Sequence, residues 1–259
     1  MADTIAVLSL KGGTGKTTTV RTLADVLRRI GLDVLTIDLD PQGNLSDYFD
    51  VPPDAAPTIA DVLSGDVKLK AAAHDGIVPA SPILAEVERA LSGKMGRELV
   101  LKKALKDGRK QYDIILIDCP PALGLLTVNG LVAADWALIS SEAQYFALQG
   151  VTGALEVIDQ AREYYNSELE FLGVVMNIAD MRTTHSRDAY AQLREEFGDK
   201  VFETVIRSSI AYAESAERAL SILDYRPDLG ADYLALADEV LARIGRDDAR
   251  GALAPMLLD

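Results

Sequence analysis

A glycine-rich segment with two lysines lies near the start of the chain, where residues 11–17 read Lys-Gly-Gly-Thr-Gly-Lys-Thr. Glycines let the backbone curl so that several N–H groups face one anion, and a helix that begins directly after the loop adds its positive dipole. Lys16 is placed to reach the β- and γ-phosphates of a nucleotide, and the Thr17 hydroxyl is placed to ligate Mg²⁺. We expect the rest of the phosphate-binding site to comprise Gly12, Gly13, Thr14, Gly15 and Thr18.

Such a loop needs a strand before it and a helix after it, and the sequence supplies both. An apolar run at residues 4–10 precedes the loop, and a helical pattern at residues 17–30 follows it. Further apolar runs of strand length occur at residues 33–37, 114–117, 136–139, 171–176 and 201–206, and further helical patterns at 149–165, 187–197 and 231–244. Uninterrupted apolar strands are buried on both faces. The sequence therefore predicts an α/β three-layer sandwich: a mostly parallel sheet with helices on both faces, as in P-loop nucleoside triphosphatases.

The length of 259 residues fits one large domain. We expect that domain to span residues 1–245. The proline-rich stretch 51–57 is predicted to be a loop that opens a variable segment at residues 51–90. Residues 246–259, with several charges and a proline, are expected to form a frayed C-terminal tail.

Composition excludes several classes of protein. One cysteine and two histidines are too few for a structural zinc site, and no secretory signal or apolar run of about 20 residues is present. These features predict a cytoplasmic protein. The formal net charge of −14 repels nucleic acid at long range, so that DNA binding would require a local basic patch.

The best basic stretch is residues 94–110, which hold seven basic and two acidic residues. Helical spacing would turn Leu101, Ala104 and Leu105 towards the core. The residues then expected to face outward are Lys102, Lys103, Lys106, Arg109 and Lys110. Two interpretations stay open: a solvated helix face, or a DNA-facing patch. In the second, Arg182, Arg187 and Arg218 would extend the patch.

A lysine at the first position of the phosphate loop, Lys11, marks a deviant Walker A motif, and the chain resembles the ParA/Soj partition ATPases and their relative MinD over residues 3–245. Residues 38–44 (Asp-Leu-Asp-Pro-Gln-Gly-Asn) and 117–124 (Ile-Asp-Cys-Pro-Pro-Ala-Leu-Gly) carry the same resemblance. The resemblance implies ATP and Mg²⁺ as cofactors and an ATP-dependent homodimer in which Lys11 reaches the partner's nucleotide. It also implies that Asp118 is the Walker B carboxylate near Mg²⁺, and that Asp40 positions the attacking water and belongs to the metal site.

The sequence departs from the family near the nucleotide base. Asn177 is a candidate for reading a purine edge, but Ile178 replaces the lysine of a guanine-recognition box, which favours adenine over guanine. Arg207 stands where the family has a proline and is our candidate near the base. Ser208 and Ala211 replace two arginines that contribute to non-specific DNA binding in the family, so DNA binding is an open question for this chain.

The resemblance predicts a positioning ATPase that forms ATP-dependent dimers, segregates DNA or a protein assembly, associates with a surface such as the nucleoid, and hydrolyses ATP when a ParB-like adaptor binds. The first alternative is a metabolic P-loop ligase or synthetase, which would need a pocket for a second substrate. The second alternative is a membrane-cycling regulator of the MinD type. The acidic tail disfavours that alternative, so no membrane partner is expected.

Overall fold

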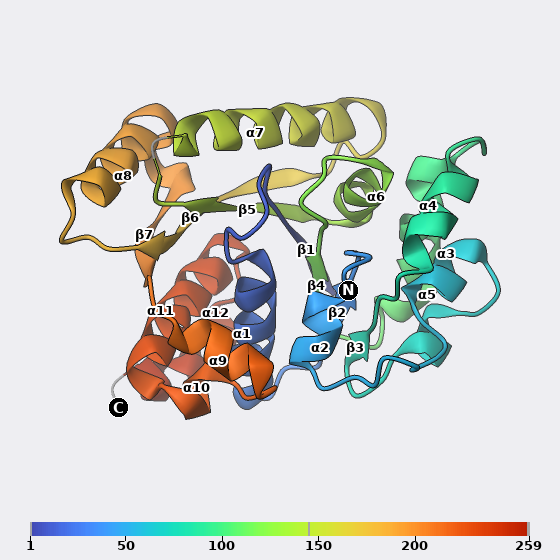
Figure 1. Ribbon diagram of the computed structural model, residues 1–259, viewed down its shortest axis with the longest axis horizontal. Helices are drawn as coiled ribbons and strands as arrows, with labels where there is room; N and C mark the ends of the chain where they lie inside the picture. Colours follow the sequence, from blue (N-terminus) through green and yellow to red (C-terminus); the bar gives the residue numbers. More distant parts are fainter. Residues whose placement is uncertain (1, 145, 258–259) are drawn as a thin grey trace.

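The computed structural model of the protein describes residues 2–144 and 146–257, with every side chain in them except that of Asp107. These residues form one sheet of seven parallel strands in the order β3-β2-β4-β1-β5-β6-β7. The strands are β1 (Asp3–Leu8), β2 (Val34–Asp38), β3 (Ile77–Val78), β4 (Ile114–Asp118), β5 (Trp136–Glu142), β6 (Glu170–Ala179) and β7 (Val201–Arg207). Helices cover both faces of this sheet (Figure 1), which confirms the predicted fold class.

Each face of the sheet has its own apolar core, and β1 contributes to both. Ile5 and Val7 belong to one buried cluster, whereas Ala6 and Leu8 belong to the other. Successive side chains of a strand point to opposite faces, so an uninterrupted apolar strand is what two covered faces require. This double burial explains why the strands could be predicted as continuous apolar runs.

The cluster that contains Ala6 packs under helical elements from residues 59–200. Its helical elements are α3 (Ile59–Ser64), η1 (Leu69–Ala72), α4 (Leu84–Leu91), η2 (Arg97–Leu99), α5 (Val100–Gly108), α6 (Leu125–Ala133), α7 (Ala147–Tyr164), α8 (Thr184–Phe197) and η3 (Gly198–Lys200). On the opposite face lie α1 (Lys16–Arg29), α2 (Asn44–Tyr48), α9 (Ala211–Glu217), α10 (Ile222–Tyr225), α11 (Pro227–Arg243), α12 (Asp247–Leu253) and η4 (Ala254–Leu257). The first helix, α1, and the last helical elements, α12 and η4, therefore lie on the same face of the sheet.

The expectation of a frayed tail is wrong for residues 247–257, which form α12 and η4. Ala249 and Leu253, four residues apart, are buried in the cluster that α11 also joins. The Arg250 guanidinium donates two hydrogen bonds, of 2.8 and 3.0 Å, to the Asp238 carboxylate on α11. The ion pair and the two buried apolar side chains thus hold α12 against α11, although the composition of this segment indicated a frayed tail.

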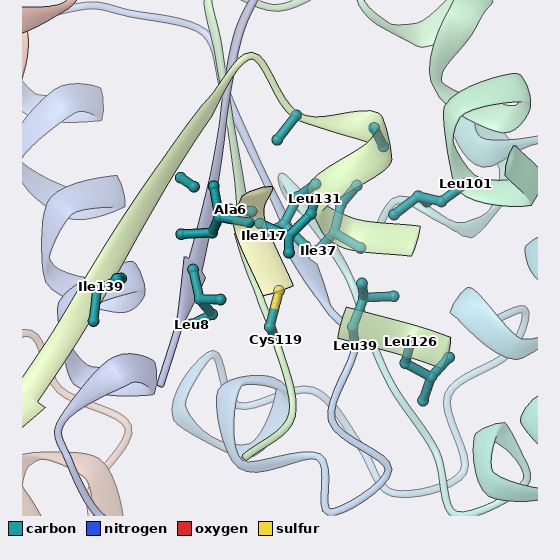
Figure 2. Close-up of a cluster of buried hydrophobic side chains, with 14 of the residues drawn as sticks. Ala6, Leu8, Ile37, Leu39, Leu101, Ile117, Cys119, Leu126, Leu131 and Ile139 are labelled. Atoms are coloured by element: carbon teal, nitrogen blue, oxygen red, sulfur yellow. The ribbon is translucent and has the colours of Figure 1, made fainter. Parts of the chain in front are cut away.

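Strands β1, β2 and β4 lie side by side and end together. Val7 is paired with Asp118 across one ladder, and Asp38 is paired with Asp118 across the next. Directly after the end of β4 comes Cys119, which is fully buried among Ile117, Leu39 and Leu131 (Figure 2). The carboxyl edge of a parallel sheet is where open α/β folds bind ligands, and here it collects the predicted site residues.

Candidate functional site

The phosphate loop joins the end of β1 to the start of α1 through two glycines in left-handed conformation. Gly13 has φ +76° and Gly15 has φ +83°, values that side-chain-bearing residues rarely adopt. A Cβ atom on Gly15 would also lie 3.2 Å from Cγ of Asn177 on β6. Glycine is therefore required at position 15 both for backbone conformation and for the close approach of the loop to the sheet.

The loop forms one wall of a cavity of about 670 Å³. The predicted site residues that line this cavity are Gly12, Gly13, Thr14, Gly15, Lys16, Thr17, Thr18, Asp40, Asn177 and Arg207. Two predicted residues do not line it: Asp118 lies buried beneath the loop, and Lys11 lines a separate, smaller cavity. The structure therefore brings ten of the twelve candidates to one surface.

Lys16, Thr17 and Asp118 form the floor of the site. The Nζ atom of Lys16, whose residue is 6% exposed, lies 3.0 Å from Ser9 Oγ. The Thr17 hydroxyl donates to Asp118 Oδ2 over 2.7 Å, while the buried Oδ1 of Asp118 has no hydrogen-bond partner. Burial, and then repulsion from Asp38, raises the pKa of Asp118 to about 8. The floor thus contains a buried carboxylate with an unused oxygen, which is the type of group that a cation or its water shell satisfies.

In Asp38, by contrast, both carboxylate oxygens accept hydrogen bonds from the protein. Its Oδ1 accepts from the Asp40 N–H over 3.0 Å, and its Oδ2 accepts from the Ser46 N–H and hydroxyl over 3.0 and 2.8 Å. Burial nevertheless raises the pKa of Asp38 to about 6. These bonds hold the turn after β2, and Asp40 at that turn faces the cavity. Asp38 therefore positions Asp40.

A hydroxyl that the sequence analysis did not select fixes the loop from below. Ser140 Oγ on β5 donates to the Thr14 carbonyl over 2.7 Å and lies 2.7 Å from Asn177 Nδ2, which donates to it. Asn177 lies within β6, two residues before the strand ends, and its Nδ2 also contacts Thr19 Oγ1 at 3.3 Å. The Asn177 amide nitrogen thus bonds to β5 and α1, and the side chain lies close to Gly15 of the phosphate loop. The available signal was a serine near the end of a buried strand, since Ser140 lies two residues before the end of β5.

The far end of the cavity is formed by β7 and α9. Tyr212 and Tyr233 line it together with Arg207, whose guanidinium pairs with Asp232 at 2.9 Å. The Tyr212 hydroxyl is buried without a hydrogen-bond partner, and the pKa of Tyr233 is raised by complete burial. This end offers aromatic and aliphatic surface, which suits a flat heterocycle better than a phosphate.

Lys11 faces away from this cavity. Its side chain is 64% exposed, and its Nζ lies 3.0 Å from Glu142 Oε2 and 2.9 Å from Gln144 Oε1. The two partners come from β5 and the residues that follow it. The loop therefore carries one lysine directed into its own cavity and one directed outward.

The predicted basic face is only partly formed. Leu101 and Leu105 are buried as expected, and Lys103, Lys106 and Lys110 are exposed. Two residues expected to face outward are instead tied to the protein: Lys102 donates to Asn166 Oδ1 over 3.0 Å, and Arg109 forms an ion pair with Asp135. Of the arginines proposed to extend the face, Arg182 pairs with Asp180, Arg187 donates to the Arg182 carbonyl, and Arg218 lies over the Tyr225 ring.

Comparisons with known proteins place this site in a family. The family model described as an AAA domain matches residues 2–171. The chromosome-partitioning ATPase Soj of Thermus thermophilus is 40% identical over 248 residues, which cover 93% of this chain and 96% of that protein.

Two solved structures share the fold. The apo McdA structure from Cyanothece superposes with a TM-score of 0.84 at 25% identity, covering 93% of this chain and 100% of that one. A Mycobacterium smegmatis protein described as cobyrinic acid a,c-diamide synthase, with bound ADP and magnesium, gives a TM-score of 0.76 at 37% identity over 84% and 91% of the two chains. Among the described helices, none has the length and apolar character needed to cross a bilayer. The chain belongs to the ParA/Soj family of P-loop ATPases.

Proposed function

We propose that the chain is a Mg²⁺-dependent ATPase that dimerises when it binds ATP and positions a cargo, DNA or a protein assembly, in the cytoplasm. The observation that carries the proposal is the division of the phosphate loop, with Lys16 in the cavity of its own chain and Lys11 directed outward. A lysine that lines no part of its own nucleotide cavity is available to a nucleotide held by a second copy. The match to Soj supports the same conclusion.

The described residues fit a nucleotide with its metal. The loop N–H groups and Lys16 would hold the β- and γ-phosphates, and Thr17 and Asp118 would hold the cation and its water shell, assisted by Asp40. The unpartnered Oδ1 of Asp118 supports this assignment, since a buried carboxylate oxygen without a donor is costly. Bound magnesium would neutralise phosphate charge. The M. smegmatis relative with ADP and magnesium supports the same pair of ligands.

Asp40 is the residue that we assign to hydrolysis. It faces the cavity from the turn after β2, and its carboxylate accepts the Gln42 N–H over 3.0 Å, which fixes its orientation. A fixed carboxylate beside the phosphate end can hold a water molecule in line for attack on the γ-phosphorus. Asp40 therefore controls the lifetime of the ATP state.

Tyr212 and the neighbouring aliphatic residues form the base-binding end, and Arg207 borders it. Asn177 lines the cavity beside the phosphate loop, where its amide bonds to Ser140. We therefore assign Asn177 to the support of the loop, and we expect adenine to be held mainly by apolar contacts.

The ATP-bound dimer is the active state of the proposed switch. We expect a ParB-like adaptor to trigger hydrolysis, and the loss of the γ-phosphate to release the dimer and reset the cycle. Non-specific DNA of the nucleoid is the surface that the family resemblance suggests. Since the family arginines are replaced here, DNA binding has to be tested directly.

The first test uses Asp40→Ala, because this change should slow hydrolysis and accumulate the ATP state. The variant is sedimented with random-sequence duplex DNA in ATP or ADP across a salt series. Binding that requires ATP and weakens steeply with salt is the expected result for a nucleoid-based switch. An Asp40→Ala protein that hydrolyses ATP at the normal rate would remove Asp40 from the site, and an ATP-bound dimer without DNA affinity would direct attention to a protein surface.

A second function, a small-molecule synthetase, is favoured by the name of the M. smegmatis relative. Such an enzyme transfers phosphate to a small substrate and needs no second copy or adaptor. The two functions differ in concentration dependence. A turnover rate per chain that is constant across protein concentrations, and that rises only with a carboxylic acid substrate, would support the synthetase; a rate that rises as dimers form would support the switch.

A further inference from the structure

A further cavity, of about 540 Å³, lies away from the phosphate loop, between α3, η1 and α5. Three lysines, Lys68, Lys70 and Lys103, line it together with the apolar residues Val62, Val67, Leu69, Val100 and Ala104. None of its lining residues belongs to the nucleotide cavity. Its helices lie together at the edge of the molecule opposite α8 (Figure 1). We call this cavity the lysine groove.

Among the described residues, no carboxylate offsets the charge of the lysine groove within its lining. Lys68, Lys70 and Lys103 form no ion pair with any side chain that the structure describes, and no described carboxylate lines the groove. The chain as a whole has 40 acidic and 26 basic residues, and many of its arginines are paired, as Arg109 is with Asp135. Lysines without an ion pair also occur elsewhere among the described residues, as at Lys94 and Lys106, but in the groove three of them line one cavity that has no described carboxylate in its lining.

The floor of the lysine groove is apolar. Val67, Val100 and Ala104 are only partly buried, so their methyl groups remain accessible within it. The fit between η1 and α5 is close, because a Cβ atom on Gly108 would lie 2.7 Å from Leu69 Cδ2. The groove thus presents a fixed apolar floor with a positive rim.

We propose that the lysine groove is a docking site for an acidic amphipathic segment of a partner protein. Apolar side chains of that segment would cover the floor, while its carboxylates would pair with the three lysines. A nucleic-acid backbone would satisfy the lysines but would bring no apolar group to the floor. The net charge of −14 does not prevent such binding, since charges more than about 8 Å away are largely screened at physiological ionic strength.

The probe is a fluorescent peptide of about 16 residues, made of leucine and glutamate with the leucines three and four apart. Fluorescence anisotropy with the full chain should show saturable binding. A peptide of the same composition with its order scrambled has the same charge but no apolar face, and it should bind much more weakly. Equal binding of the two peptides, or no binding of either, would overturn the proposal.

Charge reversal tests the rim. The triple variant Lys68→Glu, Lys70→Glu, Lys103→Glu should weaken peptide binding about tenfold, since three exposed ion pairs are lost. The matched control reverses Lys94, Lys106 and Lys110 to Glu, which changes the net charge equally at exposed lysines outside the groove. Peptide affinity of the control should stay within about twofold. An equal loss in both triples would show general attraction and contradict a specific site.

The floor is tested by Val67→Thr with Val100→Thr, which keeps side-chain shape and charge. This double variant should weaken the peptide several-fold while its melting temperature and ATP binding stay close to those of the unchanged protein. Two other ligands are run in parallel: a duplex DNA, and vesicles of phosphatidylglycerol. Binding of either ligand that depends on the groove lysines but not on the two valines, without peptide binding, would overturn the proposal in favour of that ligand.

Discussion

The inner and outer halves of the phosphate loop differ in how their lysines are held. Lys16 is 6% exposed and lies against Ser9 above the buried Asp118. Lys11 has a side chain that is 64% exposed and is held by one ion pair and one amide. Removing the buried lysine leaves buried carboxylates without a counter-charge, whereas the exposed pair can exchange its partner at little cost. The inner half is therefore suited to binding the phosphates of the chain's own nucleotide. The outer half is suited to exchanging its contact with Glu142 for a contact with a second copy.

The largest effect should come from the inner half. Lys16→Ala removes the cation at the phosphate-loop end of the cavity and should weaken ATP binding at least about a hundredfold, because a buried charge partner of the phosphates is lost. Calorimetric titration with a non-hydrolysable ATP analogue measures the change, and far-UV circular dichroism checks folding. Unchanged affinity would show that the cavity does not hold phosphates.

Lys11→Ala applies the same truncation to the outer half. ATP affinity should stay within about threefold, because Lys11 lines no part of the nucleotide cavity, while ATP-dependent dimerisation should fall at least about tenfold. Sedimentation velocity over a range of protein concentrations measures the dimer. An ATP-dependent dimer with unchanged affinity between its subunits would mean that Lys11 does not contact the nucleotide of the partner as proposed.

A stability measurement sharpens the description of the inner half. Burial raises the pKa of Asp118 to about 8, so the folded protein binds this proton more tightly than the unfolded chain, whose aspartate pKa is about 4. Ionisation therefore lowers stability progressively as the pH rises from about 4 to 8. In the absence of nucleotide, Asp118→Asn should raise the free energy of unfolding by about 1 kcal/mol at pH 8 and by less at pH 5. Urea unfolding at the two pH values tests this expectation.

Asp54→Asn, which changes an exposed loop carboxylate, is the matched control and should show no such pH-dependent gain. If Asp118→Asn destabilises the protein equally at both pH values, the carboxylate is structural and the buried-charge description is wrong.

The smallest effect concerns the contact that holds Lys11. Glu142→Gln removes the charge and keeps the size of its partner, which should make ATP-dependent dimerisation about two- to threefold tighter, in line with the modest strength of exposed ion pairs. Asp159→Asn, which breaks the exposed pair with Arg162 on α7, is the control. Weaker dimerisation of Glu142→Gln would indicate that Glu142 itself contributes to the dimer.

The parts of the molecule that the sequence predicted are those with local signals. Six strands appear as continuous apolar runs because both sheet faces are buried, and the phosphate loop is recognised because its glycines and lysines are adjacent. The strand β3 was missed because it contains only two residues. Helix α6 is apolar on nearly every side, so it lacks the periodicity that identifies a surface helix.

Residues whose roles depend on distant partners were missed or misplaced. Ser140 contacts a loop carbonyl 126 positions earlier in the chain, and no spacing rule connects the two. Arg109 was expected to face solvent, but its side chain forms an ion pair with Asp135, which follows α6, and is largely buried. Asn177, which we predicted as a base contact, lines the nucleotide cavity, and its amide nitrogen also bonds to Ser140 on β5. The contacts of Ser140 and Arg109 depend on strand order, which a single sequence does not contain.

Cys119 gives the protein a natural reporter. It is the chain's one cysteine, it directly follows Asp118, and it is wholly buried with its thiol pKa raised. Gly130 leaves no space beside it, since a Cβ there would lie 2.8 Å from the sulfur. A thiol reagent can therefore reach Cys119 only in molecules whose segment after β4 has opened, and the labelling rate measures how often this happens. Alkylation kinetics measured with ATP, with ADP and without nucleotide would therefore compare how often this segment opens in each state, without an introduced label.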